Sequence, residues 1–336
     1  MELEAWVESD AIPRVSDIAL GVILLIVGVF FLWLAPDRSA SGEMGPGPGF
    51  FPAVMGGLLC VVAAVLLARA ALRRSPPPVR RSRPLYVAIA AAAIVALYFV
   101  LQTWGAPLFL RFGPPEFMAL VVLELAIALA LAQSSRLRAA GMALFGLLLA
   151  TVGMDAVTGT LRFTLGVEGL LHGVDAGIAL VGLFVVADAF VCLASPKLFL
   201  LSYTRLVTAW QATRIPLFVA LVMRLAAVLA VAAACYYAYW LMESYVEISW
   251  VLVFGVLGVA AKIFGWNRFL LCMGVAFGDR LEQHLRHTLM LAQGDPALLL
   301  QPINGTLLLA AIVILAGAVV LSLRRAAGAR AARPAS

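Results

Sequence analysis

Four ionisable side chains stand out in this sequence because of where they lie. Glu124, Asp188 and Arg224 each fall well inside a long apolar stretch, and Arg162 falls in a loop between two such stretches. An ionisable group near the centre of a membrane costs about 2.5–3.5 kcal/mol on insertion scales, so such a residue normally faces protein or water. Glu124, Asp188 and Arg224 therefore each call for a partner or a function, and Arg162 is of interest as a possible carboxylate ligand.

Glu124 lies about nine residues into its stretch, near the expected midplane, where a carboxylate can carry a coupling ion or a proton. A structural hydrogen bond to a neighbouring helix is the alternative. Asp188 and Arg224 lie at depths of about 9 and 12 Å at 1.5 Å per helical residue, so the sequence allows a buried ion pair between them. Arg224 is also a candidate ligand for a substrate carboxylate.

Arg162 stands in the loop string TGTLRF. A guanidinium group binds a carboxylate through a two-pronged fork, which makes this arginine a second candidate for substrate binding. The alternative is a loop arginine held by Asp155 or by a backbone carbonyl.

Metal binding and catalysis are not predicted. His284 and His287 are three residues apart, a spacing that zinc can use, but two ligands do not make a site. With Glu282 and Arg286 beside them, we interpret this stretch as a solvated interfacial face. We find no arrangement of nucleophile and base, no carboxylate pair and no nucleotide-binding loop in a context that would support catalysis, so no catalytic residue, cofactor or enzyme activity is predicted.

The composition is that of an integral membrane protein. The 336 residues are 64% hydrophobic and only 12% charged, whereas soluble domains carry about a quarter charged residues. The net charge of +6 comes from arginines in loops that flank apolar stretches, which indicates topology and lipid contacts and not nucleic acid. The four cysteines lie in apolar segments without CxxC spacing and are interpreted as small buried side chains.

An arginine-rich loop sets the expected orientation. Arg69–Arg83 holds six arginines, no acidic residue and a Pro-Pro-Pro run. Short loops rich in Lys and Arg stay in the cytoplasm, so the loop places the N-terminus in the cytoplasm and the Gly-Pro linker Asp37–Gly49 outside. The arginines at the end of the chain predict a cytoplasmic C-terminus as well.

We therefore predict an all-α, multi-pass membrane protein with about ten membrane segments. One of them is expected to be broken near Gly278, because nine apolar residues are followed there by the amphipathic string DRLEQHLRHTLMLAQ. The expected segments are Ile18–Pro36, Phe50–Ala68, Leu85–Leu110, Pro115–Ala132, Ala139–Met154, Ala176–Ala194, Pro216–Leu241, Ile248–Phe264, Phe269–Gln293 and Leu298–Leu321.

Two parts of the chain resemble subunits of one transporter family. The string GEMGPGPGFFP at Gly42–Pro52, between two apolar helices, resembles the small TctB-type membrane subunit of tripartite tricarboxylate transporters. FGPPEFMAL at Phe112–Leu120, the stretch Gly146–Gly166 and GVAFGDRLEQHLRHTLMLAQGDP at Gly274–Pro296 resemble the large TctA-type permease subunit. On this basis residues 1–104 are a TctB-like region and residues 105–336 a truncated TctA-like region.

The resemblance implies a membrane component of a secondary transporter that takes up carboxylated solutes across a bacterial inner membrane. It implies a periplasmic solute-binding protein as partner and a proton or sodium gradient as the driving force, in addition to the lipid bilayer. Two Pro-Gly-rich substrate loops of the large subunit have no counterpart here, so no substrate residue is carried over from the family. An accessory or structural subunit without transport of its own, and a chain that works only beside a full-length large permease subunit, therefore remain as alternatives.

Overall fold

A computed structural model describes residues 12–34, 47, 49–72, 112–132, 135–155, 158–164, 166, 170–194, 217–243, 245–293, 295 and 301–331. The predicted crossing Leu85–Leu110, the arginine-rich loop beyond Leu72 and most of the Gly-Pro linker lie outside these residues. The orientation that depends on them stays a prediction.

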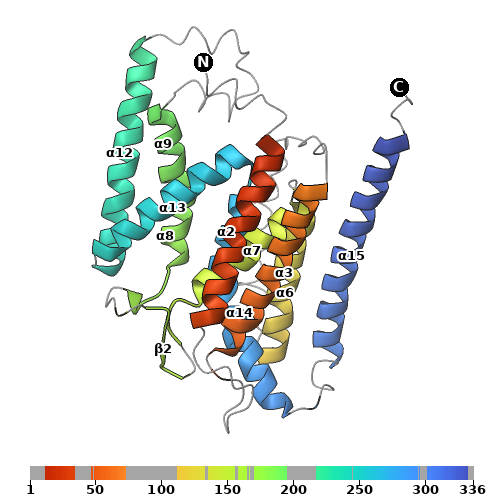
Figure 1. The fold of residues 1–336 in the computed structure, drawn as a ribbon. Helices are drawn as coiled ribbons and strands as arrows, with labels where there is room; N and C mark the ends of the chain where they lie inside the picture. The colour runs from red at the N-terminus through yellow and green to blue at the C-terminus, as the bar shows by residue number, and fades with distance from the viewer. Residues whose placement is uncertain are drawn as a thin grey trace.

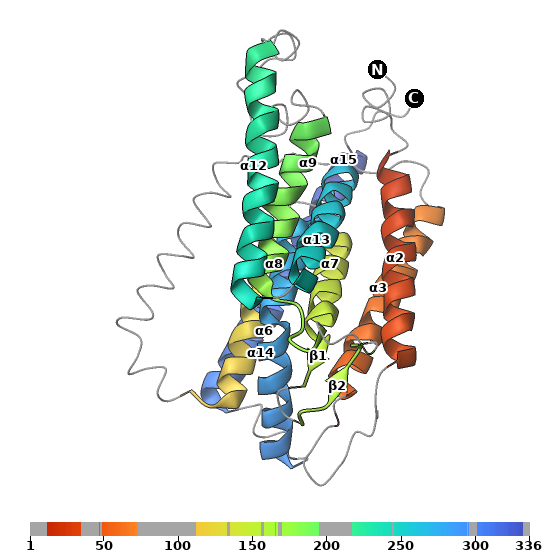
Figure 2. The same ribbon diagram turned by 90° about the vertical axis from the view of Figure 1, so that its left-hand side faces the viewer.

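The described residues form a bundle of long helices, most of them running along one common direction (Figures 1 and 2). In Figure 1, α12 lies at the left edge and α15 at the right edge, with α2, α3, α6, α7 and α14 between them. The elements are α2 (Ile12–Leu34), α3 (Phe50–Leu72), α6 (Pro114–Leu131), α7 (Arg136–Ala150), β1 (Gly153–Met154), β2 (Leu161–Arg162), α8 (Ala176–Leu180), the π-helical turn η2 (Val181–Val186), α9 (Ala187–Ala194), α12 (Leu217–Met242), α13 (Tyr245–Phe264), α14 (Arg268–Ala292) and α15 (Pro302–Ala331).

Seven helical stretches in the described part are long and apolar enough to cross a membrane by length and composition: α2, α3, α6, the continuous α8–η2–α9 rod, α12, α13 and α15. Large apolar side chains on them remain exposed, such as Ile26 at 63%, Leu221 at 64% and Ile312 at 62%. Such surfaces are stable only against lipid or another protein. The chain is an all-α integral membrane protein, as predicted; the count of ten segments stays a prediction.

The predicted break at Gly278 is wrong. Helix α14 is continuous for 25 residues, from its N-cap Asn267, whose Oδ1 accepts a hydrogen bond from the Leu270 N–H at 3.2 Å, to Ala292. Gly278 is buried inside this helix, and a Cβ atom there would collide with the Cβ of Ala150 on α7. The glycine thus permits close packing of two helices and does not bend one.

Helices α7 and α14 cross so closely that their backbones are in contact. A Cβ atom on Gly146 would overlap the carbonyl oxygen of Leu271, and a Cβ atom on Gly274 would overlap that of Ala143. Gly274 and Gly278 form a GxxxG pattern, and small residues at this spacing let two membrane helices approach closely. This crossing joins α14 to the centre of the bundle.

A second close contact joins α13 to the α8–η2–α9 rod. A Cβ atom on Gly258 of α13 would lie 2.6 Å from the Leu183 oxygen, and one on Gly182 would lie 2.7 Å from the Val251 oxygen. The chain between α7 and α8 forms the short antiparallel ribbon β1–β2, in which Gly153 pairs with Arg162. Figure 2 shows this ribbon beyond the end of α7.

The α7–α14 crossing predicts a glycine-specific loss of stability. Replacing Gly274→Ala should lower the melting temperature of the protein in detergent, because overpacking a closed contact costs about 1–3 kcal/mol. Gly57→Ala on α3 is the matched control, since a Cβ there meets nothing within 4 Å and alanine favours helix by about 1 kcal/mol over glycine. Equal melting temperatures for the two variants would contradict the close crossing.

Candidate functional site

The loop after α7 holds two charged residues in fixed positions. The Asp155 N–H donates to the Thr160 oxygen at 2.9 Å, and the Gly159 N–H donates to the Asp155 oxygen at 2.8 Å. The Asp155 carboxylate also accepts hydrogen bonds from the N–H and hydroxyl of Thr158. Arg162 follows on β2, opposite Gly153. These hydrogen bonds hold the Asp155 carboxylate beside the ribbon, where Oδ1 lies 3.4 Å from Arg162 Nη2.

Two charged residues of α14 complete a buried network with this loop. Arg162 binds Glu282 with both prongs of its guanidinium, Nη1 to Oε1 at 2.5 Å and Nη2 to Oε2 at 3.1 Å. Arg286 Nη1 donates to Asp155 Oδ1 at 2.9 Å and to Oδ2 at 2.7 Å. Two longer contacts connect these pairs into one network: Arg162 lies 3.4 Å from Asp155, and Arg286 lies 3.6 Å from Glu282.

This four-charge network, Asp155, Arg162, Glu282 and Arg286, is almost fully enclosed. The exposed fractions of the four residues are 2%, 4%, 2% and 1%. Two arginines and two carboxylates sum to zero charge, which a buried site requires because removing one partner would leave an uncompensated ion. Burial by itself raises the pKa of Asp155, but the hydrogen bonds from Thr158 and Arg286 and the charges of Arg162 and Arg286 bring that pKa below its ordinary value.

The network determines what the predicted residue Arg162 can do. Its fork is occupied by Glu282, and Asp155, the partner that the sequence offered as an alternative, lies 3.4 Å away. The prediction that Glu282 and Arg286 form a solvated interfacial face is wrong, because α14 packs along α7 and turns both side chains inward. A substrate-binding role for Arg162 remains a prediction that requires this pair to open.

The predicted histidine pair separates into two environments. His284 is half-buried and its ring stacks on Phe117 of α6 at 5.2 Å, whereas His287 is exposed. Within the described ranges, no group of three or more His, Cys, Asp or Glu side chains could hold a metal ion.

The pairing predicted between Asp188 and Arg224 is also wrong. Asp188 Oδ1 binds Lys262 Nζ at 3.0 Å and Arg268 Nη1 at 3.1 Å, while Arg224 lies exposed on α12. Arg268 additionally donates to the Leu183 oxygen at 3.0 Å, and so fixes the start of α14 to the η2 turn. The depth estimate placed Asp188 and Arg224 at compatible heights, but depth says nothing about the direction in which each helix turns its side chains.

Glu124 occupies the position that was predicted to carry a coupling ion. It is half-buried on α6, within electrostatic range of Arg280 on the neighbouring α14. The ion-coupling role of Glu124 stays a prediction, with a structural hydrogen bond to a neighbouring helix as the alternative.

One buried acid escaped the sequence prediction. Glu247, in the first turn of α13, is 1% exposed, and its Oε2 atom has no hydrogen-bond partner among the described residues. Asp175 and His172 lie within electrostatic range of it. Asp175 itself caps α8, with Oδ1 accepting from the Gly177 and Ile178 N–H groups at 2.8 and 3.0 Å. From sequence, Glu247 looks like a solvated residue at the outer end of a helix.

Two parts of the chain match families of membrane components of one transporter system. Residues 18–132 match the tripartite tricarboxylate transporter TctB family, and residues 85–200 match the tripartite tricarboxylate transporter TctA family. The chain joins TctB-like and TctA-like sequence. It is also 48% identical over 81 residues to an uncharacterized 52.8 kDa protein in the TAR-I ttuC' 3'region of Agrobacterium vitis, which covers 24% of this chain and 16% of that protein. No solved structure matches the chain significantly.

The two matches divide the structure. Helices α2 and α3 lie in the TctB-like part, α7 to α9 lie in the TctA-like part, and α6 lies in the overlap at residues 85–132. That overlap contains the predicted junction at residues 104 and 105, which stays a prediction. Asp155 and Arg162 fall inside the TctA match, whereas Glu282 and Arg286 lie beyond residue 200. The resemblance of Gly274–Pro296 to the large subunit likewise stays a prediction.

A double-mutant cycle tests the four-charge network. Arg162→Gln or Glu282→Gln alone should lower stability in detergent by about 3–5 kcal/mol, because each leaves a buried charge without its partner. The double variant should lose clearly less than the sum of the two single losses, since no lone charge remains. Asp188→Asn in combination with Arg162→Gln serves as the control pair, because Asp188 binds Lys262 and Arg268 whereas Arg162 binds Glu282 and Asp155. Additive losses for Arg162 and Glu282 would reject the pairing.

Proposed function

We propose that this chain is an accessory membrane subunit of a tripartite carboxylate uptake system in a bacterial inner membrane, and that a full-length large subunit supplies the substrate pathway. A family of membrane transporter components points away from an enzyme. In this proposal a periplasmic solute-binding protein delivers the solute, and an ion gradient drives uptake.

The observation that supports an accessory role is the closed fork of Arg162. The guanidinium that the sequence offers to a substrate carboxylate is already bound at 2.5 and 3.1 Å by Glu282. The two Pro-Gly-rich loops expected of a large subunit also have no counterpart in the sequence. Exposed apolar faces on α2 and α12 leave area for a membrane partner beside lipid.

Uptake of labelled citrate and of simpler dicarboxylates tests this role directly. Cells would express the solute-binding protein with this chain alone, with a large subunit alone, or with both. We expect uptake to require the large subunit and to rise when this chain is added. Uptake with this chain alone would overturn the accessory role. Equal uptake by the large subunit with and without this chain would show that the chain has no part in uptake.

Autonomous transport is the second candidate, and Glu247 favours it, because its Oε2 atom has no hydrogen-bond partner among the described residues. A buried acid with such an oxygen can take up and release a proton or a small cation. If Glu247 has this role, Glu247→Gln should abolish uptake driven by a pH gradient while the yield of folded protein stays unchanged. Glu124→Gln is the matched comparison, because it removes the other acid predicted for coupling. Uptake that persists in a variant rejects the coupling role of that residue.

A further inference from the structure

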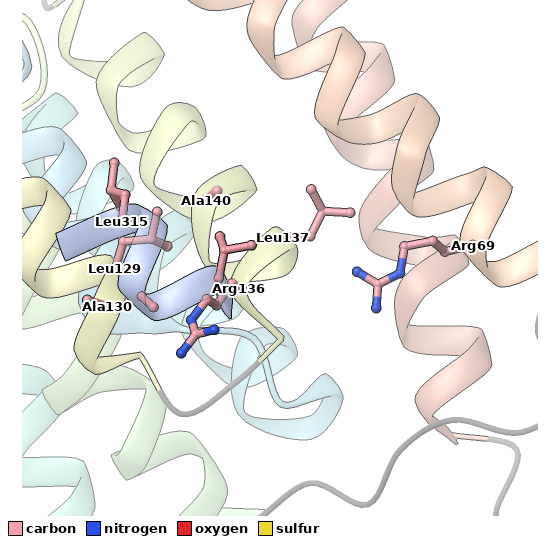
Figure 3. A pocket seen from close by; sticks show the side chains of 9 residues that line it. Arg69, Leu129, Ala130, Arg136, Leu137, Ala140 and Leu315 are labelled. Carbon is pink, nitrogen blue, oxygen red and sulfur yellow. The ribbon is translucent and has the colours of Figure 1, made fainter. Parts of the chain in front are cut away.

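A cavity of about 320 Å³ lies where the ends of three helices meet the middle of a fourth. Arg69 near the end of α3 and Arg136 at the start of α7 line it, together with seven apolar residues from α6, α7 and α15. Figure 3 shows the two guanidinium groups projecting into this region from different helices. The volume is at the lower end of the range of small-ligand pockets, about 300–1,000 Å³.

Arg136 is incompletely hydrogen-bonded within the described residues. Its Nε and Nη1 atoms are buried and have no hydrogen-bond partner in the part of the chain that the structure describes, and the cavity lining contains no acidic residue. Buried guanidinium nitrogens without acceptors are costly. Arg136 also opens α7, whose N-cap Ser135 makes no side-chain cap, so the positive end of the helix dipole adds to the charge of both arginines.

The rest of the lining is apolar and continues onto the lipid-facing surface. Leu129 of α6, Leu137 of α7, and Leu315 and Val319 of α15 are part of this lining. Val319 is 49% exposed, and its neighbours along α15, Ile312 and Val313, are 62% and 60% exposed. A ligand here meets cationic groups at one end and hydrocarbon along its length.

We propose that the cavity binds an anionic phospholipid, with its phosphate between Arg69 and Arg136 and its acyl chains along α6 and α15. A free phosphate or carboxylate would share the ionic contact but would leave seven apolar residues facing water. This end of the bundle is the predicted cytoplasmic end, where anionic lipids and basic pockets between membrane helices meet.

Native mass spectrometry of the purified chain in detergent measures this binding. The probes are phosphatidylglycerol and phosphatidylcholine with identical acyl chains. We expect phosphatidylglycerol to bind more tightly, and Arg136→Gln to weaken its binding about fivefold, as expected for the loss of one basic contact. Arg136→Lys should weaken it less, because the charge is kept.

Three controls make the result specific. Arg224→Gln removes an exposed arginine of α12, which does not line the cavity and lies across the bundle from α15 (Figure 1), and should leave phosphatidylglycerol binding unchanged. Ala140→Phe should weaken binding by filling the cavity without changing any charge. Inorganic phosphate or citrate in millimolar excess should not displace the lipid. Equal affinity for the two lipids, an equal loss in Arg224→Gln, or displacement by the soluble anions would overturn the proposal.

Discussion

The close crossing of α7 and α14 is the constraint on which the rest of the structure depends. Because Gly146 and Gly274 carry no side chain, the two backbones meet. The part of α14 beyond this contact then turns one face toward the loop after α7. That rotation places Glu282 opposite Arg162 and Arg286 opposite Asp155. A helix with four charges in eight residues can then lie inside a membrane protein, because two of those charges are neutralised by the loop and Asp279 and Arg280 stay exposed.

The charged residues fall into two groups by the way in which their burial is compensated. In the first group, each charge has opposite charges at hydrogen-bond distance, as in the four-charge network and in Asp188 with Lys262 and Arg268. These residues bind distant segments of the chain together. In the second group, Glu247 and Arg136 bury polar atoms without a partner in the described residues. Since a buried unpaired group is destabilising, the second group is where binding or ion coupling is to be sought.

The sequence predicts the long apolar helices well and the side-chain partners poorly. Apolar stretches with few charges, such as those of α3 and α13, are defined by length and hydropathy, which are properties of one segment alone. The partner of Asp188 depends on how three helices are rotated about their axes, and depth along a helix contains no such information. Gly278 shows the same limit: a glycine between an apolar and a charged half is compatible with a break or with a close contact, and only the presence of Ala150 decides. Matching opposite charges in the loop at 155–162 and on α14 is the one signal that could have indicated the network.

The geometry of Arg162 also weighs on how a substrate carboxylate could ever reach it. Such a carboxylate would have to displace Glu282, which is held beside Arg162 by the packing of α14 and therefore acts at a high effective concentration. Displacement would also leave the buried Glu282 carboxylate without the Arg162 guanidinium, and Arg286 with Asp155 as its remaining partner in the network. This loss costs several kcal/mol, which the new contact must first offset. A dissolved dicarboxylate brings no contact of its own that Glu282 lacks, apart from its second charge. Unless that charge meets a second cation, the network favours its own closed form, and the loop after α7 serves to hold α14 in place.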